Sequence, residues 1–309
     1  MIEARALTKR YGNKTAVDQV DFTVVPGKVT GFLGPNGAGK STTMRMIVGL
    51  DRPTSGHVTV NGKPYRQHRS PLREVGALLD AKAVHTGRSA YHHLLAQAAT
   101  HGIGKARVRE VIELTGLQSV ARKRVGGFSL GMGQRLGIAA ALLGDPATLI
   151  LDEPVNGLDP EGVQWVRTLV RGLAAEGRTV LLSSHLMSEM AVTADHIIVL
   201  GRGRVLADAP VSEITSGGST VRVRTPDPER LGAALRDIPG TRLPDGAISL
   251  TGVTAEQVGE AAAAAGVVLH ELTPVANSLE EAYFSLTNDE VEYRAGGEQP
   301  AATAEGVAR

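Results

Sequence analysis

The eight residues from Gly34 to Ser41 have the composition of a phosphate-binding loop. Their sequence, Gly-Pro-Asn-Gly-Ala-Gly-Lys-Ser, fits the pattern G-x-x-x-x-G-K-[ST]. Gly37 and Gly39 allow the backbone to curl so that several N–H groups converge on one anion. Lys40 is then placed to bridge the β- and γ-phosphates of a nucleotide, and the Ser41 hydroxyl is a ligand for Mg²⁺. We expect the nucleotide to contact Gly34, Pro35, Asn36, Gly37, Ala38, Gly39, Lys40, Ser41 and Thr42.

The sequence around this loop supplies the elements that such a site requires. The apolar run Val29–Leu33 predicts a buried strand, and helical spacing of apolar residues follows from Ser41 to Leu50. The helix begins where its positive dipole end faces the bound phosphate. The alternative is a glycine-rich turn that binds no ligand. Such a turn needs no strand before it and no helix after it, so the setting of this loop favours phosphate binding.

Two acidic residues end a second buried strand. Asp152 and Glu153 follow the apolar run Thr148–Leu151, so both carboxylates lie at the edge of the sheet where ligands bind in parallel α/β proteins. Asp152 can hold Mg²⁺ through water, and Glu153 can orient and deprotonate the water that attacks the γ-phosphate. Alone, the triplet Asp-Glu-Pro is more typical of a strand-ending turn; the phosphate loop in the same chain favours the catalytic interpretation.

Composition excludes several other kinds of protein. The chain has 309 residues, which is enough for about two domains. It has no cysteine, so thiol chemistry is excluded. Its formal net charge of +1 does not favour a polyanionic partner such as nucleic acid. Its 5 Tyr, 4 Phe and 1 Trp are few for a protein that stacks many bases. No apolar run approaches the roughly 20 residues of a membrane span, and the first residues do not resemble a secretory signal, so we expect a cytoplasmic protein.

The order of predicted elements indicates an α/β core of about residues 1–215. Turns at Pro26-Gly27 and Asn61-Gly62 separate strand-like segments at the start of the chain, which predict a partly antiparallel sheet. Buried strands that alternate with helices follow. The expected elements are extended segments at 16–25, 58–60 and 72–79, an inserted helical subdomain at 89–143, strands at 148–151, 179–182 and 197–200, and a helix at 163–173.

A small accessory domain is predicted over residues 216–290. A Gly/Ser-rich linker precedes it, and strands and helices then follow in the order β-α-β-β-α-β. Capping-box spacings at Thr254 with Gln257 and at Ser278 with Glu281 predict helix starts. Residues 291–309 contain almost no large apolar side chain and predict a disordered tail. The expected elements are strands at 220–225 and 267–273, helices at 227–237 and 254–265, and two short strands around 244–246.

A third segment resembles the signature of one family. Phe128-Ser-Leu-Gly-Met-Gly-Gln-Arg135 lies between the phosphate loop and Asp152, and residues 1–215 resemble the nucleotide-binding subunit of ABC transporters. Three further marks of that family appear in order: Tyr11, Asn156-Gly-Leu-Asp159 and Ser184-His185. The resemblance implies a P-loop NTPase of the ABC ATPase type, with a RecA-like core, an antiparallel β subdomain and a helical subdomain, followed by a small α+β accessory domain.

The resemblance also implies roles for these marks. Ser129 and Gly131 face the γ-phosphate held by another subunit, so that two chains pack head to tail around two ATP molecules. Asp159 belongs to the D-loop beside the nucleotide, and His185 is a switch that contacts the γ-phosphate and the attacking water. Tyr11 stacks on the adenine, although an aromatic residue before a glycine is about as typical of simple packing.

The chain departs from the family pattern at three positions. Leu130 stands where the common signature has Gly, and Met132 where it has Gln. Asp80 stands where the family usually carries a Gln to which coupling is assigned. A water-mediated metal contact of Asp80 and an Asx turn or helix cap both stay open. These variations resemble the daunorubicin-resistance and antibiotic-export branch.

The resulting hypothesis is an Mg²⁺-dependent ATPase subunit that energises export of a drug-like molecule. The cargo path then lies in a separate integral-membrane permease on whose cytoplasmic face this chain sits, and residues 81–91 are the candidate docking segment. Two intact half-sites make a homodimer sufficient. The alternative is an ABC-type ATPase that acts on ribosomes or DNA; single cassettes without sustained heptads are not typical of that class, and no direct nucleic-acid contact is expected.

Overall fold

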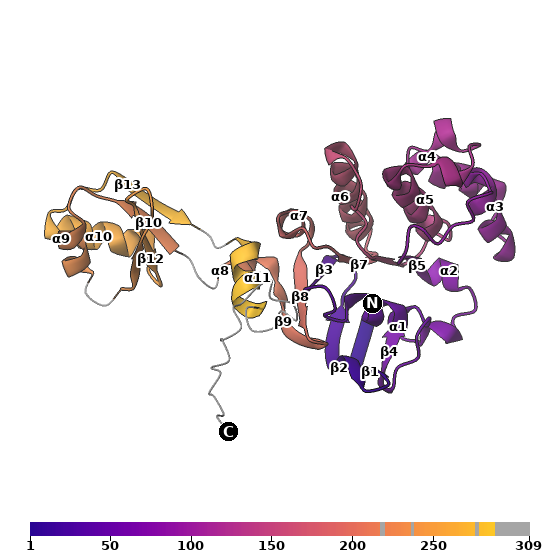
Figure 1. Cartoon of the computed structure of the whole chain (residues 1–309), viewed down its shortest axis with the longest axis horizontal. Helices are drawn as coiled ribbons and strands as arrows, with labels where there is room; N and C mark the ends of the chain where they lie inside the picture. Colours follow the sequence, from indigo (N-terminus) through magenta and orange to yellow (C-terminus); the bar gives the residue numbers. More distant parts are fainter. Residues whose placement is uncertain (217–219, 236–237, 276–277, 288–309) are drawn as a thin grey trace, which may run out of the picture.

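Three β-sheets organise the chain, and helices separate and cover them. The computed structural model describes residues 1–216, 220–235, 238–275 and 278–287. A large sheet and a small antiparallel sheet form the first part of the molecule, and a third sheet lies apart at its other end (Figure 1). Among these residues no helix is both long and apolar enough to cross a membrane.

The central sheet has six strands, of which the first five in spatial order are parallel. β9 is antiparallel and closes one edge beside β8. In spatial order the strands are β5 (Val75–Leu78), β6 (Thr148–Leu151), β7 (Thr179–Ser183), β3 (Val29–Leu33), β8 (His196–Gly201) and β9 (Arg204–Pro210). The predicted buried strands are confirmed, while β9, whose side chains are only half-buried, was not predicted.

Both faces of this sheet are covered, which explains why its strands are continuous apolar runs. Successive side chains of a strand point to opposite faces. Leu149 and Leu151 therefore pack into a core shared with the helices, whereas Ile150 packs into a second core shared with the small sheet. The side chains of Leu149, Leu151 and Ile150 are all fully buried.

The small sheet is antiparallel and lies against α1 (Lys40–Ile47) (Figure 1). Its order is β2 (Lys14–Val24), β1 (Ile2–Tyr11), β4 (Ser55–Val60). The antiparallel sheet predicted for the start of the chain is confirmed. Its central strand, β1, was not predicted, because charged residues interrupt its apolar positions.

The helical subdomain follows β5. It contains α3 (Ala90–Thr100), α4 (Lys105–Leu114) and α5 (Leu130–Leu142), with short 3₁₀ turns at Gln118–Val120 and Val125–Gly127. The extended segment expected over residues 72–79 is only half correct, since α2 (Pro71–Glu74) forms its first part. Proline at the first helical position favours this turn of helix. Helices α6 (Pro160–Ala175) and α7 (Met187–Thr193) complete the cover of the central sheet.

The accessory sheet has the predicted β-α-β-β-α-β order. Its spatial order is β11 (Gly240–Arg242), β12 (Ile248–Thr251), β10 (Thr220–Arg224), β13 (Glu271–Val275), all antiparallel, with α9 (Pro228–Ala234) and α10 (Ala255–Ala265) packed into one core with it. The Thr254–Gln257 capping box is present, and Gly266 ends α10 in the left-handed conformation. The tail predicted at 291–309 and part of the predicted linker lie outside the described residues.

The last described helix belongs with the first part of the molecule. α11 (Leu279–Thr287) begins at the predicted Ser278–Glu281 capping box and packs against α7 and α8 (Val211–Ser216) (Figure 1). Leu279 and Tyr283 are buried in the core that contains the central sheet. The chain therefore returns from the accessory sheet to the nucleotide-binding part, although these residues were expected to belong to the accessory domain.

Candidate functional site

The phosphate loop joins β3 to α1 at the carboxyl edge of the central sheet. Gly37 and Gly39 have φ angles of 84° and 103°, the left-handed region that favours glycine. A Cβ atom at Gly39 would lie 2.6 Å from the main-chain oxygen of Ala16. Gly39 also precedes α1 without a side-chain cap, so the first N–H groups of the helix stay open to an anion. The predicted loop residues from Asn36 to Thr42 line one hollow together with Asp152 and Glu153.

Lys40 lies folded into this loop. Its Nζ donates to the main-chain oxygens of Gly34 at 2.6 Å and Pro35 at 3.2 Å, and the residue is 8% exposed. Burial lowers the pKa of Lys40, while the carboxylates of Glu153 and Asp152 oppose that shift. An anion in the hollow gives the ammonium group a better partner than two carbonyls.

Ser41 and Asp152, both predicted to hold a metal, meet across the site. The Ser41 hydroxyl donates to one carboxylate oxygen of Asp152 at 2.7 Å, and the Ser183 hydroxyl donates to the other at 2.5 Å. Ser183 ends β7, the strand next to β6, so it holds the carboxylate toward Ser41. A hydroxyl and a carboxylate are the oxygen ligands that Mg²⁺ prefers.

Glu153 and His185 are in direct contact. The Nδ1 atom of His185 lies 2.7 Å from Oε2 of Glu153, and the backbone N–H of His185 donates to the same oxygen at 3.4 Å. The two residues follow the neighbouring strands β6 and β7. The structure thus brings the candidate base and the candidate switch to one point beside the phosphate loop.

Asp80 is exposed and forms a local turn. Its Oδ1 accepts a hydrogen bond from the backbone N–H of Lys82 at 2.8 Å, which is the Asx turn left open by the sequence. Asp80 follows β5, the neighbour of β6, so it lies at the same edge of the sheet as Asp152. Its place in metal binding stays a prediction.

Tyr11 presents an exposed ring near the start of the chain. The side chain is 48% exposed, and its hydroxyl donates to Oδ2 of Asp51 at 2.9 Å. The ammonium of Lys9 lies 4.8 Å from the ring centroid. A fixed and exposed ring fits the predicted stacking on a base.

The signature residues lie on another subdomain. Ser129 is the exposed N-cap of α5, and its Oγ accepts from the N–H of Met132 at 3.2 Å. Gly131 follows in the first turn. Within the described residues, no hydrogen bond joins this helix start to the phosphate loop. Ser129 and Gly131 therefore stand at the N-terminus of a helix that belongs to a different subdomain from the phosphate loop.

The D-loop packs against the unusual residue of the signature. Gly157 has a φ of 73°, and a Cβ atom there would lie 2.3 Å from Cδ2 of Leu130. Asp159 is the N-cap of α6 and accepts from the N–H of Gly162 at 2.8 Å. Leu130, where the family commonly has glycine, thus covers the D-loop of its own chain.

Replacing Gly157 by alanine is expected to destabilise the protein and lower ATPase activity, because the methyl group strains the left-handed backbone and collides with Leu130. We expect a loss of roughly 1–3 kcal/mol in the free energy of unfolding, measured by denaturant titration. Adding Leu130→Ala to the Gly157→Ala chain should recover part of the lost free energy of unfolding, because it removes the collision but leaves the backbone strain. Equal stability of the single and double variants would contradict the contact.

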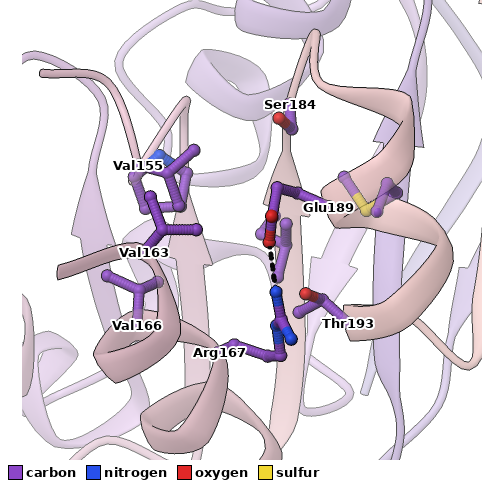
Figure 2. A pocket seen from close by; sticks show the side chains of 10 residues that line it. Val155, Val163, Val166, Arg167, Ser184, Glu189 and Thr193 are labelled. Carbon is purple, nitrogen blue, oxygen red and sulfur yellow. Dashed lines mark hydrogen bonds and ion pairs between the residues drawn. The ribbon is translucent and has the colours of Figure 1, made fainter. Parts of the chain in front are cut away.

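Behind the D-loop and the switch, an ion pair joins α6 to α7. The Nη2 atom of Arg167 lies 2.6 Å from Oε2 of Glu189, in a small hollow that Val155, Val163 and Ser184 help to line (Figure 2). The Nε atom of Arg167 is buried and has no hydrogen-bond partner among the residues that the structure describes. This pair connects the helix that Asp159 begins with the helix that follows His185.

Comparison with known proteins agrees with this geometry. The family model described as ABC transporter matches residues 17–156, and one described as Domain of unknown function (DUF8746) matches residues 219–280. The bacitracin transport ATP-binding protein BcrA of Bacillus licheniformis is 42% identical over 217 residues, which are 69% of this chain and 71% of that protein. The lantibiotic transport ATP-binding protein SrtF of Streptococcus pyogenes is 36% identical over 208 residues, 67% of this chain and 90% of that protein.

Solved structures share the same fold. The structure of an ATP-binding subunit of an ABC transporter has a TM-score of 0.64 and 28% identity, and the match covers 69% of this chain and 91% of that one. A dimeric bacterial ABC transporter cassette has a TM-score of 0.63 at 24% identity and covers 68% of this chain and 99% of its own. The chain belongs to the ABC transporter family, as an ATP-binding subunit. The predicted family and fold are confirmed, and the chain is an ATPase whose hydrolysis is coupled to transport.

Three contacts of the site were not predicted from the sequence. The Gln134 amide donates to the main-chain oxygen of Glu153, Ser183 bridges Asp152 to the backbone of Glu153, and Arg167 pairs with Glu189. Gln134 stands inside the quoted signature segment and Ser183 directly precedes the Ser184-His185 pair. For Gln134 and Ser183, this closeness to the family's motifs was the available signal. Each of the three contacts, however, joins segments that are distant in sequence.

Proposed function

We propose that this chain is the Mg²⁺-dependent ATPase subunit of an exporter for drug- or antibiotic-like molecules, and that it acts with a separate membrane-spanning permease. One observation carries the proposal: a phosphate loop, a metal-binding hydroxyl–carboxylate pair and a candidate base with its histidine line one edge of the sheet. The names of BcrA and SrtF, both transport ATP-binding proteins for antibiotics, support the cargo class.

The residues present fit a nucleotide and its metal. The N–H groups of the loop and Lys40 would hold the β- and γ-phosphates, and Tyr11 would stack on the adenine. Ser41 and Asp152 would hold Mg²⁺, since their oxygens already lie 2.7 Å apart. The metal would neutralise charge on the phosphates. Asp80 is a third oxygen at the same sheet edge, and we assign it a water-mediated contact.

Glu153 would act as the base for the attacking water. Its carboxylate stands beside the phosphate loop and is oriented by His185 through a 2.7 Å contact. His185 would also sense whether the γ-phosphate is present, because loss of that group changes the charge next to the imidazole ring. Phosphoryl transfer depends mainly on such positioning and charge stabilisation.

Two copies of the chain would complete each site. Ser129 and Gly131 offer a helix N-terminus, and within the described residues no hydrogen bond joins them to the phosphate loop of their own chain. In a head-to-tail homodimer the signature of one copy would close on the γ-phosphate bound by the other, with Asp159 and the D-loop beside it. Solved dimeric cassettes share this fold.

The permease would dock on the helical subdomain. Two neighbouring hollows share Tyr91 and Arg122, and one of them is also lined by Arg88 and Arg124. The end of the proposed docking segment, residues 81–91, lines one of these hollows with Gly87, Arg88, Ser89 and Tyr91. The arginines suit an acidic or carbonyl-rich segment of a permease on the cytoplasmic side of the membrane.

A crosslinking experiment tests the shared site. Because the chain has no cysteine, Asn36→Cys and Ser129→Cys can be introduced alone and together without a background thiol. In a Glu153→Gln chain that carries both cysteines, a short bifunctional thiol reagent should give a covalent dimer with ATP and Mg²⁺ and little without ATP. Mixing the two single-cysteine chains should also give the dimer.

The exposed Ser119→Cys, placed in the same subdomain, is the matched control in place of Ser129→Cys and should give no ATP-dependent product. Absence of an ATP-dependent dimer from the Asn36–Ser129 pair, or equal crosslinking of Ser119→Cys, would rule out the head-to-tail arrangement.

A further inference from the structure

Glu153 has a backbone conformation that its side chain does not favour. Its φ angle is 50°, in the left-handed region that costs a residue other than glycine roughly 1 kcal/mol or more. Such a conformation persists only where the surroundings hold it. The direction of the Glu153 carboxylate therefore depends on whatever fixes this one peptide.

Side chains from two other elements hold both backbone groups of Glu153. Its N–H donates to Oγ of Ser183 at 2.9 Å, and its carbonyl accepts from Nε2 of Gln134 at 2.8 Å. The N–H of Asn156 donates to the same carbonyl at 3.2 Å. Only the Gln134 bond comes from the helical subdomain, because Ser183 belongs to the central sheet.

Gln134 is unusual among its neighbours on α5. The residue is 4% exposed, and it precedes a run of buried apolar residues that includes Leu136 and Ile138. A buried amide needs a partner, and a carbonyl that already accepts one turn hydrogen bond has a second lone pair for it. The contact is thus specific: an apolar residue of the same size would fill the space without holding the carbonyl.

α5 contacts the segment after β6 at a second point. Its first residue, Leu130, packs on Gly157, four residues after Glu153. Gln134 and Leu130 therefore tie one helix to both ends of the segment that carries the candidate base and the D-loop. Ser129, the N-cap of the same helix, is the residue that we place against nucleotide on another copy.

We propose that Gln134 is a positioning residue that sets the left-handed peptide of Glu153, and through it the direction of the catalytic carboxylate, according to the position of the signature helix. This inference rests on the proposed role of Glu153 as the base. The Gln134 amide holds the carbonyl of Glu153, and the left-handed peptide then directs the carboxylate into the hollow beside the phosphate loop.

The test removes the amide but keeps its volume. Gln134→Met and Gln134→Leu are compared with Gln118→Leu, an exposed glutamine of the same subdomain whose amide contacts only a nearby carbonyl. We expect kcat for ATP hydrolysis to fall about 10- to 100-fold in both Gln134 variants, as misplacement of a reacting group predicts, with KM for ATP changed less than about twofold. Gln118→Leu should keep wild-type kcat.

A double variant separates positioning from general damage. In a Glu153→Gln chain, Gln134→Met should cause no further loss of the residual rate, because the group that it positions is already inactive. The inference is overturned if both Gln134 variants keep wild-type kcat, if KM rises in place of a fall in kcat, or if the loss is equal in the Glu153→Gln chain. If Glu153→Gln itself hydrolyses ATP normally, the proposed function fails instead.

Discussion

Glu153→Gln is expected to lower kcat for ATP hydrolysis about 10²–10⁴-fold, the contribution of a positioned general base. Glutamine keeps the size of the side chain and an oxygen that can accept from His185, whose Nδ1 lies 2.7 Å from the carboxylate. ATP should therefore still bind, and the ATP-bound dimer should accumulate because hydrolysis no longer makes its two copies dissociate. Steady-state phosphate release and size-exclusion chromatography with ATP and Mg²⁺ measure the two effects.

Glu176→Gln is the matched control for this substitution. Glu176 is an exposed carboxylate that pairs with Arg178, away from the phosphate loop. Its loss should leave kcat within about twofold of wild type, since surface ion pairs contribute little. Near-normal hydrolysis by Glu153→Gln would remove Glu153 from the role of base.

Lys40→Ala is expected to weaken ATP binding about 10- to 100-fold and to abolish measurable turnover, because a charge-assisted hydrogen bond to the phosphates is lost. Among the described residues, the hydrogen-bond partners of the ammonium are the main-chain oxygens of Gly34 and Pro35. Titration of a fluorescent ATP analogue gives Kd directly.

Thermal unfolding of Lys40→Ala without nucleotide serves as its internal check. The variant should unfold at a temperature close to that of wild type, so that weaker ATP binding is not explained by loss of the fold. Lys28→Ala, an exposed lysine before β3, should bind ATP normally. Unchanged affinity of Lys40→Ala would mean that the loop does not hold the phosphates through this residue.

Sequence patterns predicted the site where the chemistry is local. The phosphate loop needs its glycines at fixed spacing, and left-handed φ angles at Gly37 and Gly39 follow from that need. Continuous apolar runs predicted the parallel strands, because both faces of the sheet are covered. The loop, the strands and Asp152 could therefore be placed before any coordinates were known.

The remaining contacts depend on tertiary structure. Gln134 is one polar residue in a helix and gives no periodic signal, and its partner is a main-chain oxygen 19 residues later in the chain. The contact of Leu130 with Gly157 is a fit between the start of a helix and a loop, which spacing does not encode. The edge strand β9 was missed because an exposed edge does not require an apolar run.

The return of α11 to α7 gives the accessory domain two attachments to the ATPase core. Leu279 and Tyr283 are 3% and 7% exposed in that core, so a chain cut after residue 216 would leave an apolar patch on the helix that follows His185. Deletion of everything after residue 216 would therefore also remove the cover that α11 gives to α7. A deletion that removes the accessory sheet but keeps α11 would isolate the contribution of the accessory domain.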